Sequence, residues 1–390
     1  MAIISEVSGT AGSELPVAWR KACTGFGVRL PSSSDNFLDS VRESTARYIN
    51  SVAEPPIVSV SSDNVKHYVD GLDVEKFDKY VAHVTGWSRS LPLVFDSLTQ
   101  ELNLIALLDL LQIGSGFRRE LHQASGRGAS DTIKFGCLSL HISQTRLDAK
   151  GLQALTLGDI SEHFGIPLFG EERPMSEGST AVMVSEASAL RPLAEMILGI
   201  LQDTGHRLEQ SGFTSLAEFI IKMCTEKPLA SHLVAKLVAA FPSLRDAAEI
   251  GGQPVYLFKK AQLMAYDVSQ RFGKTEEIFN FADLGDMTLF ADSVVPAMLQ
   301  HHGLITPSQA VSSKIEKGQE LTLEETTAMR AASIVAAQQV VDFMNDPRSN
   351  IKRGEIAVTQ ATLVNFWWYE GKEADLRSIP RLVCKNTVYF

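Results

Sequence analysis

The stretch ASALRPLAEMILGILQ, residues 187–202, carries the plainest structural signal in this sequence. Its apolar residues recur every three or four positions, at Leu193, Met196, Ile197, Ile200 and Leu201. Because that spacing places them along one face of an α-helix, the stretch predicts an amphipathic helix.

The same periodicity recurs through the second half of the chain. Leu233, Leu237 and Val238 repeat it just before Phe241 and Pro242, where the proline ends the helix. Further helices are expected over residues 256–272, 286–302, 321–345 and 357–370. Runs typical of strands are few, and they occupy residues 57–62, 133–143, 254–258 and 382–390. The sequence therefore predicts a mainly α fold, a helix-dominated α+β class with a few short strands.

Glycine, serine and charged residues gather in two segments, 122–132 and 169–180, which we expect to be loops. The first 35 residues are expected to form an N-terminal arm, part of it disordered. No clean linker divides the rest of the chain. We therefore expect residues 36–390 to form a single domain, and a division into two intimately packed lobes, 36–185 and 186–390, stays open.

The composition is that of an average soluble globular protein, with 45% apolar and 21% charged residues in a chain of 390. No apolar run reaches the ~20 residues of a membrane-spanning helix, and the first thirty residues lack the pattern of a secretory signal peptide. Four scattered cysteines predict buried, reduced thiols rather than disulfides or a zinc site. The net charge of −10 disfavours long nucleic acid as a partner but allows a small anionic ligand in a locally positive pocket. We expect a cytoplasmic monomer that contacts no membrane.

The segment TLFADSVVPAMLQHHG, residues 288–303, places a carboxylate at the margin of an apolar helical face. On a helix, Asp292 lies about 100° from Ala291. Pro296 follows four positions later, lacks an N–H and clashes with the carbonyl of Asp292. A carboxylate beside such a break in the hydrogen-bond ladder is a candidate functional acid. The alternative is a partly exposed helical aspartate beside an ordinary proline kink.

Lys259, Gln262 and Tyr266 share one face of the helix expected over residues 256–272, and the opposite face is apolar. Such a face offers a cation and hydrogen-bonding groups to a single ligand. It is equally the pattern of a helix face in contact with water.

Two further motifs allow a structural and a functional interpretation. FPSLRD, residues 241–246, places Arg245 and Asp246 after a Pro-Ser turn, where they form either a local ion pair at a helix corner or a pair of ligand-binding groups. Four consecutive aromatic residues, Phe366 to Tyr369, cover every direction of a helix, so some of them face something other than the core. Stacking on a base is one use of such a ring, and packing against a neighbouring element is the commoner one.

In this order, these motifs resemble those of the queuosine salvage proteins, the queuosine 5′-phosphate N-glycosylase/hydrolase family. VRES (41–44), followed by the apolar stretch that begins IVSVSS, resembles the N-terminal motif of that family. DLLQIGSGF (109–117) occupies the place of its Asp-x-Leu-Asn-Phe segment. The remaining motifs follow at matching intervals: FPSLRD (241–246), FKKAQ (258–262), TLFAD-x-x-x-P (288–296) and the aromatic-rich helix before IPRLVCKNTVYF. The resemblance runs over residues 38–390.

The resemblance implies a compact, mostly helical fold related to the helix-hairpin-helix DNA glycosylases. It also implies hydrolysis of queuosine 5′-monophosphate to queuine and ribose 5-phosphate, without a metal or another cofactor. Asp292 matches the catalytic carboxylate of the F-A-D motif, and Lys259 matches the active-site lysine of the Y-K-x-A-Q motif. A carboxylate can stabilise the positive charge that develops on the ribose and activate water. A lysine can hold the phosphate or assist departure of the base.

The other residues of the predicted site are assigned to substrate binding by position. Phe117 or Trp367 would stack on the flat base, and Asp109 would accept hydrogen bonds from its amino edge. The complete predicted binding set is Asp109, Phe117, Arg245, Asp246, Gln262, Tyr266 and Trp367.

The sequence departs from the family pattern at three places. Ser293 and Val294 replace the Tyr-Arg pair that usually follows the F-A-D aspartate. Gly114-Ser115-Gly116-Phe117 replaces the Phe-Trp ending of the Asp-x-Leu-Asn-Phe segment, and Ala328 stands where the family has a glutamate. These changes concern recognition of the base and the phosphate, so the resemblance leaves the exact substrate open.

Two hypotheses from other classes accompany the enzyme. One is a non-catalytic relative that binds a nucleotide or base without cleaving it, in keeping with the three departures. The other is a purely structural helical scaffold, which predicts no pocket that joins Asp292, Lys259 and residues 109–117.

Overall fold

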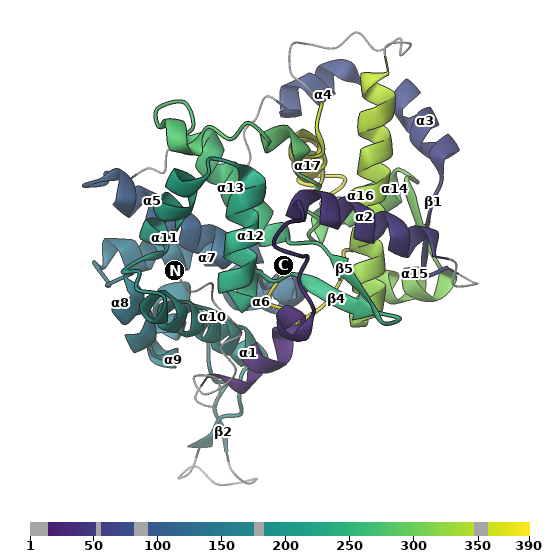
Figure 1. Cartoon of the computed structure of the whole chain (residues 1–390). Coiled ribbons are helices and arrows are strands. Elements are labelled where there is room, and N and C mark those ends of the chain that lie inside the picture. Colours follow the sequence, from purple (N-terminus) through teal and green to yellow (C-terminus); the bar gives the residue numbers. More distant parts are fainter. Residues whose placement is uncertain (1–14, 52–55, 82–92, 175–182, 347–357) are drawn as a thin grey trace. The chain divides into compact units, whose positions relative to one another are not determined.

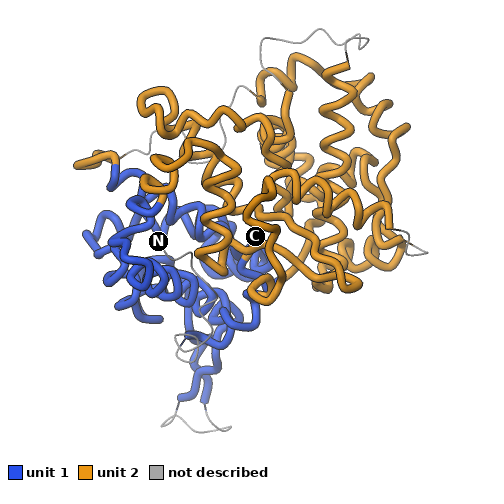
Figure 2. The backbone as a smooth tube through the Cα atoms, viewed as in Figure 1, with its two compact units in different colours: residues 1–23, 99–219, 385–388 blue, residues 24–98, 220–384, 389–390 orange. Residues whose placement is uncertain are grey.

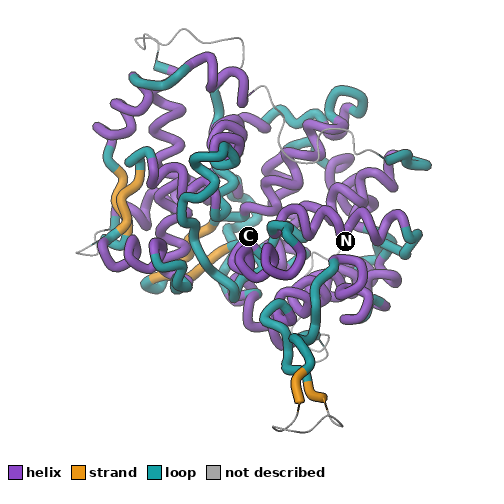
Figure 3. The backbone as a smooth tube through the Cα atoms, turned by 180° about the vertical axis from the view of Figure 1, so that it is seen from behind, coloured by secondary structure: helices purple, strands orange, loops and turns teal. Residues whose placement is uncertain are grey.

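The structure is a computed structural model that describes residues 15–51, 56–81, 93–174, 183–346 and 358–390 (Figure 1). Helices dominate these residues, and the strands among them are short and pair antiparallel (Figure 3). The predicted helix-dominated α+β class is therefore confirmed. The relation to helix-hairpin-helix DNA glycosylases stays a prediction.

The chain forms two compact units, and neither is one continuous stretch of sequence (Figure 2). Unit 1 comprises Met1–Cys23, Thr99–Phe219 and Lys385–Val388. Unit 2 comprises Thr24–Leu98, Ile220–Cys384 and Tyr389–Phe390. The arm over residues 1–35 and the domain over residues 36–390 stay predictions, and residues 1–14 of the arm lie outside the described residues.

Unit 1 is built around the long helix α10 (Arg191–Gln210), which confirms the helix predicted from residues 187–202. A Cβ at Gly199 of this helix would lie 2.4 Å from the Cβ of Trp19, so glycine is needed for the close approach of α1. The elements of unit 1 are α1 (Val17–Ala22), α6 (Arg118–Ser125), α7 (Ala129–Ile142), α8 (Ala149–Ala154), α9 (Leu157–Phe164), α10, β2 (Arg173–Pro174) and β3 (Met183–Val184). Two helices cross a boundary between the units, α5 (Leu98–Leu110) and α11 (Leu216–Glu226).

Unit 2 is organised around α16 (Leu323–Asn345), the longest helix that the structure describes. A capping box starts this helix, because Thr322 and Glu325 each accept a backbone N–H of the other. Its other elements are α2 (Phe37–Asn50), α3 (Ser62–Asp70), α4 (Val74–Val81), α12 (Ala230–Ala240), α13 (Lys259–Phe272), α14 (Val294–His301), α15 (Gln309–Glu316), α17 (Gln360–Glu370), β1 (Val58–Val60), β4 (Ala247–Ile250), β5 (Gln253–Tyr256) and β6 (Ile305–Pro307). β1 pairs with β6, and β4 forms a hairpin with β5.

Helices α2, α3, α14 and α17 of unit 2 all pack against α16. Figure 1 shows α16 running through this group of helices. Its residues Ala331, Ile334 and Ala337 are buried, so the small and apolar side of the helix forms part of the core.

Several local predictions were wrong. Residues 133–143, expected as a strand, lie almost entirely in α7, and Ile133, Cys137 and Leu140 are buried at helical spacing. Residues 382–390 form no strand but one isolated bridge, from Val383 to Glu320. The expected loop over 122–132 is limited to residues 126–128, between α6 and α7. Of the expected loop over 169–180, residues 173–174 form β2 and residues 175–180 lie outside the described residues.

The predictions for two strands and for the cysteines are confirmed. β1 lies within the strand-like run 57–62, and β5 overlaps the run 254–258 but begins one residue earlier. All four cysteines are buried thiols. Among the described residues, no helix combines the length and the apolar character needed to cross a membrane.

Candidate active site

The first element of the candidate site is the corner after α12, where Pro242 and a short 3₁₀ turn follow the last helical residue. Asp246 lies at the end of this corner and is 2% exposed. Its carboxylate accepts hydrogen bonds from both terminal nitrogens of Arg330, at 2.9 and 2.5 Å. Oδ2 also accepts the backbone N–H of Lys259, at 3.2 Å. Asp246 thus forms a long-range, buried ion pair with Arg330 of α16.

Arg245, the residue before Asp246, stabilises the same corner through hydrogen bonds to backbone carbonyls. Its guanidinium donates to the backbone carbonyls of Val238 and Ala239 at the end of α12, and to that of Phe26. These bonds satisfy carbonyls that a helix end leaves without an intrahelical partner. A direct role of Arg245 in substrate binding stays a prediction.

Arg330 was not predicted from the sequence, although it is central to this part of unit 2. Besides Asp246, it contacts the carbonyl oxygen of Ala291, to which its Nε donates at 2.8 Å. The ring of Phe390 lies against it, with 4.5 Å between the guanidinium carbon and the ring centroid. The available signal was a lone charged residue in the otherwise apolar run AMRAASIVAA, because a charge in a buried helix requires a partner.

Lys259 is the first residue of α13 and is 5% exposed. The residue before it, Phe258, has a φ of 47°, a left-handed conformation that is uncommon for a residue other than glycine. Its N–H, like that of Leu257, donates to the carbonyl of Asp246 at 2.9 Å. The turn into α13 is therefore held by Asp246 through both its backbone and its side chain.

The face of α13 that carries Lys259, Gln262 and Tyr266 is not in contact with water. Gln262 is fully buried and Tyr266 is 6% exposed, so the interpretation as a solvated face is wrong. The opposite, apolar face is buried as well, which makes α13 a helix enclosed on all sides. Burial raises the pKa of Tyr266 to about 12, with a further increase from the charge of Asp267.

The amide of Gln262 binds the segment that leads to Asp292. Its Nε2 donates to the carbonyl of Leu257 at 2.9 Å and to the hydroxyl of Thr288 at 2.8 Å. Its Oε1 accepts the backbone N–H of Thr288 at 2.9 Å. In the next residue, the N–H of Leu289 donates to the side chain of Gln360 at 2.8 Å. Residues 288–291 are thus attached to α13, α17 and α16 in turn.

Asp292 is not a helical residue, and in this respect the prediction of a helix over residues 286–302 was wrong. Helix α14 begins at Val294, so Pro296 falls in its first turn, where a backbone N–H has no intrahelical partner in any case. Oδ1 of Asp292 accepts the N–H groups of Val294 at 2.7 Å and Val295 at 3.0 Å. Asp292 therefore lies just before the helix, and its side chain binds the first two N–H groups of the helix instead of flanking a kink within it.

The consecutive aromatic residues of α17 divide between the core and the surface. Phe366 and Trp367 are buried, whereas Trp368 and Tyr369 are half-buried. Nε1 of Trp367 donates to the hydroxyl of Tyr68 in α3 at 3.0 Å. Trp367 is fully enclosed, so stacking of its ring on a base would require a rearrangement of unit 2.

Asp109 and Phe117 are both buried, but they belong to unit 1. Phe117 lies in a 3₁₀ turn before α6, and the ammonium of Lys385 is 5.6 Å from its ring centroid. Lys385 also forms an ion pair of 2.7 Å with Glu120. The participation of Asp109 and Phe117 in the same site as Asp292 stays a prediction.

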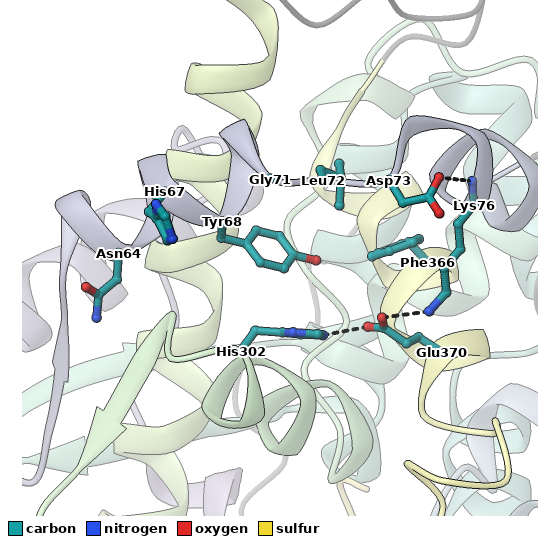
Figure 4. Close-up of a pocket in the computed structure, with 10 residues that line it drawn as sticks. All are labelled: Asn64, His67, Tyr68, Gly71, Leu72, Asp73, Lys76, His302, Phe366 and Glu370. Atoms are coloured by element: carbon teal, nitrogen blue, oxygen red, sulfur yellow. Dashed lines mark hydrogen bonds and ion pairs between the residues drawn. The ribbon is translucent and has the colours of Figure 1, made fainter.

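A separate cavity of about 540 Å³ lies in unit 2 (Figure 4). Glu370 is buried at the end of α17. Along one side of the cavity, its carboxylate lies 2.8 Å from Nε2 of His302 and 3.2 Å from Nζ of Lys76. Burial acts to raise the pKa of Glu370, but the hydrogen bonds and charges of these two partners outweigh it and lower the pKa. The cavity is lined by Asn64, His67, Tyr68, Gly71, Leu72, Asp73, Lys76, His302, Phe366 and Glu370, none of which was among the predicted site residues.

Within unit 2 the structure thus connects three motifs that are distant in the sequence. The side chain of Asp246 binds the backbone of Lys259, and Arg330 joins Asp246 to the residue before Asp292. Among the described residues, no group of three or more histidines, cysteines and carboxylates is arranged to hold a metal ion.

Comparisons with known proteins bear on the same region. The sequence profile of the queuosine salvage protein family matches residues 171–389, more than half of the chain. A Sphaerobacter thermophilus protein named queuosine 5′-phosphate N-glycosylase/hydrolase is 30% identical over 48% of this chain and 56% of its own length. Proteins of that name from Mus musculus and Bos taurus are 27% and 30% identical, over 50% and 51% of this chain and 58% and 59% of their own lengths. The chain therefore spans little more than half the length of these relatives.

The match contains the corner at Asp246, the start of α13, Asp292 just before α14 and Arg330 of α16. Because it covers more than half of the chain, this protein belongs to the queuosine salvage protein family.

Proposed function

We propose that this protein hydrolyses the N-glycosidic bond of queuosine 5′-phosphate, or of a closely related modified nucleotide, and releases the base for salvage into tRNA modification. The observation that carries the proposal is the family match over residues 171–389, together with relatives that bear the name of this hydrolase. The buried polar contacts around Asp246 and Arg330 support it, because they connect the motifs that resemble the catalytic motifs of the family.

In the proposed reaction, a water molecule attacks C1′ of the ribose while the bond between C1′ and the base nitrogen breaks. The electron pair of that bond leaves with the base, which takes up a proton from solvent. The attacking water oxygen becomes bonded to C1′, and one of its protons passes to the carboxylate of Asp292, which then releases it to solvent. The products are the free base and ribose 5-phosphate.

Asp292 is suited to this role by the way in which its carboxylate is held. Oδ1 is fixed by two backbone N–H groups at the start of α14. Among the residues that the structure describes, Oδ2 takes part in no hydrogen bond, and the side chain is partly exposed. Oδ2 is therefore the oxygen that we assign to the water and to the positive charge that develops on the sugar.

Lys259 supplies a positive charge to the proposed site. Its place at the start of a 14-residue helix adds the positive end of the helix dipole to the charge of the ammonium group. Both favour an anion, either the 5′-phosphate or the negative charge that develops on the departing base.

The remaining residues of the predicted site enter the proposal in two groups. Asp109 and Phe117 are proposed to contact the base directly. The second group is proposed to support the residues that line the binding region, since each of its side chains is bonded to or packed against protein groups. It comprises Arg245, Asp246, Gln262, Tyr266 and Trp367.

We further propose that the protein acts on a free nucleotide, as a cytoplasmic monomer and without a metal or another cofactor. The net charge of −10 favours a small ligand over long nucleic acid, whose binding relies on lysine and arginine contacts to many phosphates.

The test is a chromatographic assay of the purified full chain with queuosine 5′-phosphate, with and without EDTA. Release of queuine that EDTA does not affect is the expected result. Binding of the nucleotide without release would identify a non-catalytic relative instead. Absence of both binding and release would overturn the proposal.

A further inference from the structure

We propose that Arg330 is a positioning residue that sets the separation between Lys259 and Asp292. This inference rests on the proposed function for its catalytic consequence and on the contacts of unit 2 for its structural part. The guanidinium binds the carboxylate of Asp246 with two nitrogens and the carbonyl of Ala291 with the third.

The contacts of Arg330 lead directly to both candidate catalytic residues. On one side, the Asp246 oxygen that binds Arg330 also accepts the N–H of Lys259. On the other side, Ala291 is joined by a peptide bond to Asp292. The planar guanidinium of Arg330 therefore connects the backbone of Lys259 to the backbone next to Asp292.

The chemistry of the guanidinium makes it a spacer of defined shape. Its donors are fixed in one plane, so three hydrogen bonds to two different partners determine the distance and the angle between those partners. A lysine presents one flexible ammonium at a single point and cannot form the same set of bonds.

The surroundings keep this spacer in place. The side chains of Arg330 and Asp246 are each 3% exposed, so water and salt screen their interaction little. The ring of Phe390 lies against the guanidinium at 4.5 Å, a distance at which a cation and an aromatic ring attract each other. Arg330 itself projects from the interior of the 23-residue helix α16, a rigid support.

The other attachments of the segment before Asp292 act further away from it. Gln262 holds Thr288 and Gln360 holds Leu289, whereas Arg330 holds the residue adjacent to Asp292. Loss of the Arg330 bond would leave the chain attached at Thr288, at Leu289 and at the start of α14, but it would remove the contact next to Asp292 and allow that residue to shift. A displacement of about 1 Å at a reacting group lowers a rate by about a hundredfold.

The experiment compares Arg330→Lys with a matched variant, Arg207→Lys. Arg207 also pairs with a buried aspartate, Asp203, through its Nε at 2.9 Å, but it lies on α10 of unit 1. Both variants are assayed with queuosine 5′-phosphate well below their melting temperatures, and kcat and KM are determined separately. We expect kcat of Arg330→Lys to fall by about a hundredfold, with a much smaller change in KM, and Arg207→Lys to keep the wild-type kcat.

A second measurement does not depend on activity. Amide hydrogen exchange is followed in peptides that contain the N–H groups of Lys259, Val294 and Val295. Exchange should be faster in Arg330→Lys and unchanged in Arg207→Lys. A truncation, Arg330→Ala, is assayed with and without added guanidinium ion, which should restore part of kcat.

The outcomes separate this inference from the proposed function. If the wild-type protein releases queuine and Arg330→Lys keeps both its kcat and its exchange rates, the inference is wrong and the function stands. If the wild-type protein releases no base, the proposed function is wrong, and the catalytic role of Arg330 is overturned with it. Faster exchange at these amides would then still establish Arg330 as the group that holds the two segments.

Discussion

The carboxylate of Asp292 accepts the backbone N–H of Val295 at 3.0 Å, while the same oxygen accepts that of Val294 at 2.7 Å. The side chain thus covers the N-terminus of α14 and is oriented by the helix that it starts. The backbone of α14 therefore defines the direction in which this candidate general base points. This arrangement also allows a substitution that removes the charge of the side chain and keeps its hydrogen bonds to α14.

Asp292→Asn is expected to abolish measurable turnover while the fold is kept. Asparagine retains an oxygen at the position of Oδ1, so it can still accept the N–H groups at the start of α14, but it carries no negative charge and accepts no proton. General-base contributions of this kind amount to about a hundredfold to ten-thousandfold in rate. The assay for queuine and a thermal melt measure the two effects separately.

Asp283→Asn provides the control for Asp292→Asn. Asp283 accepts the N–H groups of Ala230 and Ser231 at the start of α12, and it belongs to the same unit. The Asp283→Asn variant should retain wild-type turnover. Undiminished hydrolysis by Asp292→Asn would exclude its carboxylate from the reaction.

Lys259→Met distinguishes the two roles open to the lysine. Methionine keeps most of the apolar volume of this buried side chain and removes its charge. We expect a larger loss of kcat/KM for the 5′-phosphorylated nucleotide than for the corresponding nucleoside, because the start of α13 favours a doubly charged anion. Equal losses for both substrates would place the charge at the departing base instead.

Trp367→Phe is expected to lower the free energy of unfolding by about 1–3 kcal/mol, because it removes the hydrogen bond to Tyr68 and part of a fully buried ring. KM should be unchanged, since the ring is enclosed within unit 2. Trp368→Phe, at a half-buried position, serves as the control and should change stability little. An increase in KM for Trp367→Phe alone would support stacking on the base.

Glu370→Gln should alter how stability depends on pH. The folded-state pKa of Glu370 lies below its ordinary value of 4.5, so its carboxylate stabilises the fold above that pH. This contribution is lost as the pH falls through the lower, folded-state pKa. Wild-type stability should therefore decrease as the pH falls below about 4.5, and Glu370→Gln should start lower and change less.

Denaturant unfolding at several pH values measures this difference. Glu226→Gln is the control, because Glu226 forms an exposed pair with Lys222, at 3.5 Å, which contributes little to stability. Parallel pH curves for the wild-type protein and Glu370→Gln would show that the contacts of Glu370 with His302 and Lys76 do not stabilise the ionised form.

The helices of the second half were predictable because their apolar residues repeat at helical spacing. That signal is physical, since it reports which side of an element is buried. The same spacing was present at Ile133, Cys137 and Leu140, but β-branched and aromatic residues in this run favoured a strand. Residues 382–390 likewise have the composition of a strand, yet a ladder needs a partner strand, which composition alone does not reveal.

Part of the candidate site could be predicted, and part could not. Lys259 and Asp292 were recognised from motifs, but the predicted helical conformation of Asp292 was wrong. An aspartate just before a helix and an aspartate inside a helix occur in similar sequences. The ion pair of Asp246 joins residues 84 positions apart. A lone arginine in an apolar helix indicates that it has a partner, but no local pattern identifies that partner, so the pairing of Arg330 with Asp246 became clear only in the folded chain.

The region that matches the family and the region that folds together overlap but do not coincide. β1 pairs with β6, and α2 and α3 cover α16, although residues 37–70 lie outside the family match. A shortened protein that contains residues 171–389 alone would expose the side of α16 that α2 and α3 now cover, and it would leave the edge of β6 unpaired. Such a fragment should aggregate, so homology is a poor guide to where this chain can be cut.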